Sequence, residues 1–229
     1  MRIGGLQKSS LIDYPDLISC IIFTQGCNFR CGYCHNPELL DPKDWAESIP
    51  VSTVLDFLKS RVGKLDALVV TRGEPTLHHD LLDFLSKVKA FGFKVKLDTN
   101  GTNPDMLGEG LEKRLIDYVA MDIKAPLHKY SFIANRDVLI ANIRRSIDLI
   151  MQKAADYEFR TTVVEDQLTY EDAMLIGKML KGAKKYYLQK FIPSKTNSPE
   201  FLDRGTYSDE ILDEMKKDLL DFVDFVDVR

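Results

Sequence analysis

The 229-residue sequence has few cysteines, few histidines and no long apolar run. It contains four cysteines, four histidines and one tryptophan. A secreted, disulfide-stabilised domain would carry more cysteines spread through a shorter chain, which argues against that class. No apolar run approaches the roughly 20 residues of a transmembrane helix, and the first residues lack the blocks of a signal peptide. We therefore expect a soluble, cytoplasmic protein with no membrane partner.

Basic residues are also outnumbered by acidic residues. The chain has 31 Lys and Arg residues against 35 Asp and Glu, a formal net charge of −4. Nucleic-acid-binding proteins usually present a basic face, so we expect no nucleic-acid partner. The length suits one large domain or two small ones. Because no low-complexity linker or solenoid repeat interrupts it, we predict a single domain over residues 1–229.

Short apolar runs alternate with amphipathic stretches along the chain. The runs are rich in Val, Ile, Phe and Tyr and are bounded by turn residues, which is typical of strands. We predict strands at Ile18–Thr24, Ala67–Thr71, Lys94–Asp98, Tyr118–Ile123, Phe159–Val164 and Tyr186–Ile192. Apolar residues at helical spacing predict the intervening helices. These are Leu55, Leu58 and Val62; Leu81, Leu85 and Val88; Ile143, Ile147 and Ile150; Ala173, Ile176 and Leu180; and Leu212, Met215, Leu219 and Phe222.

Strand–helix alternation favours a parallel sheet with crossover helices. About six such units are too few for a closed eight-stranded barrel, which leaves a doubly wound sheet or an incomplete barrel. Polar residues cluster where four of the runs end, at Gln25–Cys27, Arg72–Pro75, Asp98–Gly101 and Asp122–Lys124. Parallel α/β folds bind ligands at the carboxyl ends of their strands, so these segments predict one shared site.

Three of the four cysteines lie in one short segment, at residues 27, 31 and 34, with the spacing C-x3-C-x2-C. A cubane [4Fe–4S] cluster needs thiolates that reach separate irons, and a short irregular loop can supply them. Three thiolates leave the fourth iron open to a small chelating ligand. We predict a cluster loop at about residues 25–38.

Other interpretations of these thiols are weaker. A zinc site would need a fourth ligand, and His35 directly after Cys34 is awkwardly placed to provide it. Buried structural thiols do not suit so polar a segment, and a disulfide would leave an odd cysteine. Cys20 lies in an apolar run and is better explained as a small buried residue.

C-x3-C-x-aromatic-C after a short strand resembles the signature of the radical S-adenosylmethionine (SAM) enzymes. Residues 34–38, Cys-His-Asn-Pro-Glu, resemble the subgroup that installs a glycyl radical in a partner enzyme. Residues 3–15 are similar to the opening of proteins that activate anaerobic ribonucleoside-triphosphate reductase. The resemblance implies an α/β fold, an incomplete (β/α)6 TIM-like barrel whose parallel sheet has outer helices. It also implies a [4Fe–4S] cluster and SAM as cofactors.

The resemblance implies roles for individual residues. Cys27, Cys31 and Cys34 would bind the cluster and serve as the catalytic residues. The expected SAM contacts are Tyr33 and His35 near adenine; Gly73 and Glu74 near the ammonium group; Asp98, Thr99 and Asn100 in a ligand-binding tetrad; Asp122 near the methionine end; and Arg160 and Gln189. A monovalent cation beside Asp122 is a further expectation.

The implied reaction is reductive cleavage of SAM to methionine and a 5′-deoxyadenosyl radical, which abstracts hydrogen from a glycine of the partner. Flavodoxin or ferredoxin is the expected external reductant. The expected partner is anaerobic ribonucleoside-triphosphate reductase. The alternatives are a pyruvate formate-lyase-type partner, a small purine-like substrate, and a non-enzymatic electron carrier or sensor.

One residue departs from the family pattern. The family usually has Gly-Gly-Glu-Pro after the second strand, whereas this chain has Arg72 in the first position. Glycine allows positive φ and a close approach to a ligand, and arginine adds a permanent cation near the expected sulfonium and ammonium groups. We therefore expect weaker SAM binding than a glycine version would show, unless Arg72 points outward or pairs with Glu74.

Overall fold

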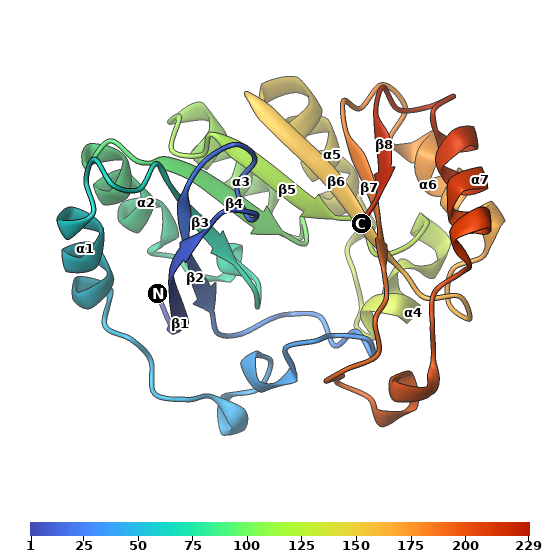
Figure 1. Ribbon diagram of the computed structural model, residues 1–229, viewed down its shortest axis with the longest axis horizontal. Helices are drawn as coiled ribbons and strands as arrows, with labels where there is room; N and C mark the ends of the chain where they lie inside the picture. The colour runs from blue at the N-terminus through green and yellow to red at the C-terminus, as the bar shows by residue number, and fades with distance from the viewer.

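The computed structural model describes all 229 residues and contains one eight-stranded sheet whose strands keep their sequence order (Figure 1). β1 (Ile3–Ser10) runs antiparallel to β2 (Ser19–Thr24), and every later strand runs parallel to its neighbour. The later strands are β3 (Ala67–Thr71), β4 (Lys94–Thr99), β5 (Tyr118–Asp122), β6 (Asp156–Val163), β7 (Tyr186–Lys190) and β8 (Val226–Val228). Because β1 and β8 are the two edges, the sheet is open. The predicted incomplete, TIM-like parallel barrel is confirmed.

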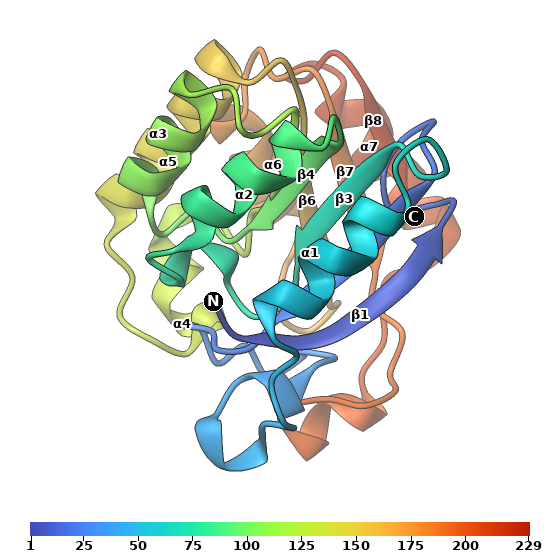
Figure 2. The ribbon, with the colours of Figure 1, turned by 90° about the vertical axis from the view of Figure 1, so that its left-hand side faces the viewer.

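Helices cover the outer face of the sheet (Figure 2). They are α1 (Val51–Ser60), α2 (Leu81–Ala90), α3 (Pro104–Glu112), α5 (Ile140–Lys153), α6 (Tyr170–Met179) and α7 (Asp209–Leu219). The short helix α4 (Tyr130–Ala134) lies instead beside the cluster loop, where the backbone N–H of Arg30 donates to the carbonyl of Ala134 (2.8 Å). None of the helices combines the length and apolar character that crossing a membrane requires. One predicted stripe was wrong at a single position: Val62 lies beyond the end of α1 and is 53% exposed, while Leu58 is buried together with Val54.

Four elements gave no clear signal in the sequence: β1, β8, α3 and the five-residue helix α4. β1 is an edge strand with two glycines, and only its first and last residues are buried. β8 has three residues. α3 contains Gly108 and Gly110, which disfavour a helix. A Cβ at Gly110 would lie 2.7 Å from Cδ1 of Ile116, so tertiary packing demands the glycine that weakens the local helix signal.

The two faces of the sheet differ in chemistry because successive side chains point to opposite sides. On β4, Val95 and Leu97 join the large core beneath the helices, whereas Lys96 and Asp98 reach into the barrel. At the amino-terminal ends of the strands, Tyr14 packs against Tyr118 with ring centroids 5.7 Å apart. The barrel interior is therefore closed at that end and polar toward the other.

Candidate active site

The carboxyl ends of the strands surround one cavity of about 470 Å3, within the usual range for small-molecule sites. All thirteen residues predicted for the site line it: Cys27, Cys31, Tyr33, Cys34, His35, Gly73, Glu74, Asp98, Thr99, Asn100, Asp122, Arg160 and Gln189. The cysteine motif, the strand-end pattern and the family resemblance therefore pointed to residues that the fold brings together, while their individual roles stay predictions.

The three clustered cysteines lie in the loop after β2 and face this cavity. No three Cys, His, Asp or Glu side chains converge as ligands of a single metal ion. Three thiols that line one cavity fit a cluster of several irons, because each thiolate binds its own iron. Burial raises the pKa of Cys27 to about 12, so iron must displace its proton on binding. Cys20 is fully buried in the core under the helices, as predicted.

The chain after β7 packs against the cluster loop, and both lie at the same end of the molecule (Figure 1). The ring of His35 stacks on Phe191 at 5.4 Å, and its Nε2 lies 3.0 Å from the carbonyl oxygen of Ile192. The backbone N–H of Ser198 donates to the carbonyl of Gly32 (3.1 Å). His35 is thus engaged by the protein rather than poised as a fourth metal ligand.

Glu74 is a fully buried carboxylate that accepts four hydrogen bonds. Oε1 accepts from the N–H and hydroxyl of Thr76 (3.1 and 2.6 Å) and from the hydroxyl of Thr99 (2.7 Å), and Oε2 accepts from the N–H of Asn100 (2.6 Å). Burial raises the pKa of Glu74, and these bonds oppose that rise. The carboxylate therefore fixes the backbone at the end of β4.

A chain of amide and hydroxyl groups joins this backbone to the cluster loop. The Asn100 carboxamide donates to Oδ1 of Asn28 (2.8 Å), and Asn28 donates to the hydroxyl of Thr102 (2.8 Å). The Thr102 hydroxyl in turn donates to Oδ1 of Asn100 (2.7 Å). Asn28 lies directly after the first cysteine of the motif, so the end of β4 and the cluster loop hold each other in place.

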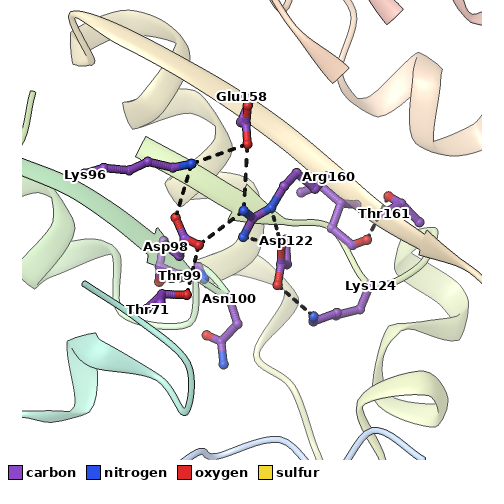
Figure 3. Close-up of polar contacts among 12 residues, drawn as sticks. Thr71, Lys96, Asp98, Thr99, Asn100, Asp122, Lys124, Glu158, Arg160 and Thr161 are labelled. Atoms are coloured by element: carbon purple, nitrogen blue, oxygen red, sulfur yellow. Dashed lines mark hydrogen bonds and ion pairs between the residues drawn. The ribbon is translucent and has the colours of Figure 1, made fainter. Parts of the chain in front are cut away.

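Arg160 bridges two strand-end carboxylates in the cavity wall (Figure 3). Its Nε lies 2.9 Å from Oδ1 of Asp122, and its Nη1 lies 3.2 Å from Oδ2 of Asp98. Lys124 donates to the other oxygen of Asp122 (3.0 Å). Burial alone would raise the pKa of Asp122, but the charges of Arg160 and Lys124 hold it well below its usual value. Asp122 is therefore ionised, and both carboxylates lie at ion-pair distance from the protein's own cations.

Sequence reasoning left out four polar residues of this region. Lys124 and Asn28 were read only as parts of strand-end and loop segments, although both help organise the cavity. Lys96 and Glu158 lie deeper in the barrel than the carboxyl ends of the strands, so the cluster of polar residues at the strand ends did not include them. Glu158 and Arg160 are two residues apart on β6 and therefore share a face of the sheet, and that spacing was the available clue.

Arg72 adopts a backbone conformation that favours glycine, with φ at 66°. Its guanidinium is exposed and lies 5.9 Å from the ring centroid of Phe23, while its backbone carbonyl accepts from the hydroxyl of Thr24 (2.6 Å). The four donors on Glu74 come from other residues, so Arg72 does not pair with Glu74. Arg72 also lines the cavity, where its charge is available to repel a cationic ligand.

Replacing Arg72 by glycine is expected to tighten SAM binding by about fivefold, equivalent to roughly 1 kcal/mol of like-charge repulsion near a protein surface. Arg72→Gln separates the effect of the charge from the effect of the backbone conformation, because it removes the charge and keeps a non-glycine residue at this position. Arg61→Gly is the matched control, since Arg61 lies over Phe57 at 5.2 Å on a remote helix end. Equal SAM dissociation constants for the wild type and both Arg72 variants would refute the repulsion.

Three comparisons relate the chain to known proteins. A family model described as the Radical SAM superfamily matches residues 21–180. A protein of Methanocaldococcus jannaschii that bears the provisional name glycyl-radical enzyme activating enzyme MJ1227 is 35% identical, over 99% of this chain and 95% of its own length. GTP 3′,8-cyclase of Helicobacter pylori strain J99 is 29% identical. That match covers 83% of this chain and 60% of the cyclase.

Solved structures share the fold at low sequence identity. Streptococcus suis SuiB bound to SAM aligns with a TM-score of 0.69 at 12% identity, covering 91% of this chain and 49% of SuiB. The protein anSMEcpe with bound SAM and a peptide aligns at 0.59 and 15% identity, covering 86% of this chain and 56% of that chain. Because the family model covers most of the sequence and one relative matches nearly all of it, this chain belongs to the radical SAM superfamily, whose members use a [4Fe–4S] cluster and SAM.

Proposed function

We propose that this radical SAM enzyme installs a glycyl radical on a partner enzyme, and that the partner is an anaerobic ribonucleoside-triphosphate reductase. The name of the full-length M. jannaschii relative supports the activating class. Residues 3–15, which form β1 and the loop that closes the barrel, carry the resemblance to reductase activators. A pyruvate formate-lyase-type partner is the second candidate.

The proposed roles follow the cavity. Cys27, Cys31 and Cys34 would hold the cluster, which when reduced supplies the electron that cleaves SAM into methionine and a 5′-deoxyadenosyl radical. The remaining contacts would orient SAM: Tyr33 and His35 at adenine; Gly73, Glu74, Asp98, Thr99 and Asn100 along the ligand; and Asp122, Arg160 and Gln189 at its polar ends. We propose that residues 1–229 act as one catalytic domain and that flavodoxin or ferredoxin supplies the electron.

The observation that carries this proposal is that most cationic side chains lining the cavity already form ion pairs with acidic residues of the protein. Arg160 is held by Asp98 and Asp122, Lys124 by Asp122, and Lys190 by Asp209 at 2.6 Å. A triphosphate substrate needs several free cations, because phosphate oxygens bind best to charged donors. Only Arg72 lines the cavity without an acidic partner at ion-pair distance. An uncharged glycine within a polypeptide therefore fits this cavity better than GTP, the substrate named for the cyclase relatives.

The test offers both kinds of substrate to the reconstituted, reduced enzyme with SAM. An anaerobic ribonucleoside-triphosphate reductase with α-deuterated glycine is expected to give a glycyl radical signal in electron paramagnetic resonance and deuterium in 5′-deoxyadenosine. Pyruvate formate-lyase and GTP are the parallel substrates. Turnover of GTP to a cyclised product, with no glycyl radical on either protein, would overturn the proposal.

A further inference from the structure

The hydroxyl of Tyr33 is a buried polar group that has no hydrogen-bond partner in the protein. Tyr33 lies between Cys31 and Cys34 in the cluster loop, is only 5% exposed and lines the cavity. An unpartnered buried hydroxyl is costly, because it gives up its hydrogen bonds to water and gains none in return. A partner bound in the cavity would remove this cost.

Aromatic packing fixes the ring that carries this hydroxyl. Phe191, which follows β7, and Phe201, in the short helical turn Pro199–Asp203, each meet the Tyr33 ring edge to face, with centroids 6.5 and 6.2 Å away. Phe191 and Phe201 also contact each other, with centroids 6.2 Å apart. Gly32 makes this packing possible, because a Cβ there would lie 2.1 Å from Cε2 of Phe201. The three rings therefore hold the hydroxyl in place without the help of a hydrogen bond.

The sulfur of Cys31 lies within the influence of this hydroxyl. Burial raises the pKa of the Cys31 thiol, whereas the charge of Lys124 and the Tyr33 hydroxyl, acting as a donor toward the sulfur, oppose that rise. Lys124 is held by Asp122, and its Nζ lies 5.9 Å from the centroid of the Tyr33 ring (Figure 3). A thiol sulfur is a weak acceptor and leaves the hydroxyl without a full hydrogen bond, whereas a charged thiolate accepts more strongly.

We propose that Tyr33 donates its hydroxyl hydrogen to the sulfur of Cys31 when the cluster is bound, and so raises the reduction potential of the cluster; this rests on the proposed role of the three cysteines as its ligands. Reduction by the external donor adds one electron, and part of that negative charge resides on the sulfurs. A hydrogen bond to a sulfur stabilises the more negative, reduced state more than the oxidised state. This role concerns the hydroxyl alone and leaves the rest of Tyr33 to the proposed contact with adenine.

Tyr33→Phe separates this role from a structural one. The variant keeps the ring contacts with Phe191 and Phe201 and removes a hydroxyl that has no partner in the protein. Before iron and sulfide are added, the full-length variant is therefore expected to melt at the same temperature as the wild type or higher. Tyr186→Phe is the matched control, because its buried hydroxyl donates to Oγ1 of Thr161 (2.8 Å) outside the cavity. That variant is expected to melt at a lower temperature and to leave the cluster potential unchanged.

The decisive measurement is a redox titration of the reconstituted proteins without SAM, followed by electron paramagnetic resonance of the reduced cluster. Tyr33→Phe is expected to make reduction about tenfold less favourable, which is a shift of about 59 mV to more negative potential for a one-electron couple. An unchanged or more positive potential, at verified iron and sulfide content, would overturn the inference. An unchanged potential together with weaker SAM binding would assign the hydroxyl to SAM and would overturn it equally.

A second variant keeps the inference testable if Tyr33→Phe assembles no cluster. Fluorotyrosine placed at position 33 alone keeps the hydroxyl and makes it a stronger donor, so the potential is expected to move in the positive direction. No shift, or a negative one, would contradict the inference. A wild-type protein that assembles no cluster on its three cysteines would instead overturn the proposed site itself.

Discussion

Replacing Cys31 by alanine is expected to abolish both cluster assembly and SAM cleavage. The three thiols line the cavity, and each would hold a different iron. Removing one thiol leaves two irons of the cubane without a protein thiolate, so the protein no longer binds the cluster stably. Iron and sulfide content after anaerobic reconstitution, together with the visible absorbance of the cluster, measures this directly.

Cys20→Ala is the matched control for that experiment. Cys20 is a fully buried thiol on β2, but it faces the core under the helices and not the cavity. The variant is expected to assemble a full cluster and to lose only about 1 kcal/mol of stability, as for the removal of a small buried group. Loss of the cluster in Cys20→Ala, or its retention in Cys31→Ala, would contradict the assignment.

Glu74→Gln is expected to produce the second large effect. The carboxylate accepts hydrogen bonds from the backbone N–H groups of both Thr76 and Asn100, one on each oxygen. A glutamine amide has one accepting and one donating end, so in either orientation its NH2 faces a backbone donor. Leaving a buried donor unpaired and weakening charged hydrogen bonds is expected to cost about 3 kcal/mol in the free energy of unfolding.

The effect should extend beyond stability to the cofactor. The N–H of Asn100 holds the segment whose side chain reaches Asn28 in the cluster loop, so a shifted Asn100 disturbs both partners. Chemical denaturation and SAM binding are the two measurements. Glu109→Gln is the control, because its pair with Lys113 is exposed and worth little. A fully stable Glu74→Gln protein with unchanged SAM affinity would disprove this role.

Much of the site could be predicted because its signals are local in the sequence. The cysteine spacing and the polar residues at or directly after the ends of β2, β3, β4 and β5 lie in short segments. A parallel sheet brings such segments together whatever the details of packing. The six central strands were recognisable for the same reason, since buried strands read as continuous apolar runs.

What the sequence could not reveal depends on contacts between distant segments. Glu158 and Arg229 are 71 residues apart, and the approach of both Lys96 and Arg160 to Asp98 exists only once the strands are aligned. β1 lacked a clear pattern because an edge strand buries few of its side chains. Arg72 was marked as unusual from the family pattern, but its exposed guanidinium and positive φ required the structure.

Product analysis of SAM is the most direct test of the central claim. The protein is reconstituted anaerobically with iron and sulfide, reduced with dithionite and given SAM. We predict 5′-deoxyadenosine and methionine in equal amounts from the wild type, and neither from Cys31→Ala. If a protein with verified iron and sulfide forms no 5′-deoxyadenosine, even as the Arg72→Gly variant, the cavity does not perform radical SAM chemistry and the account is wrong.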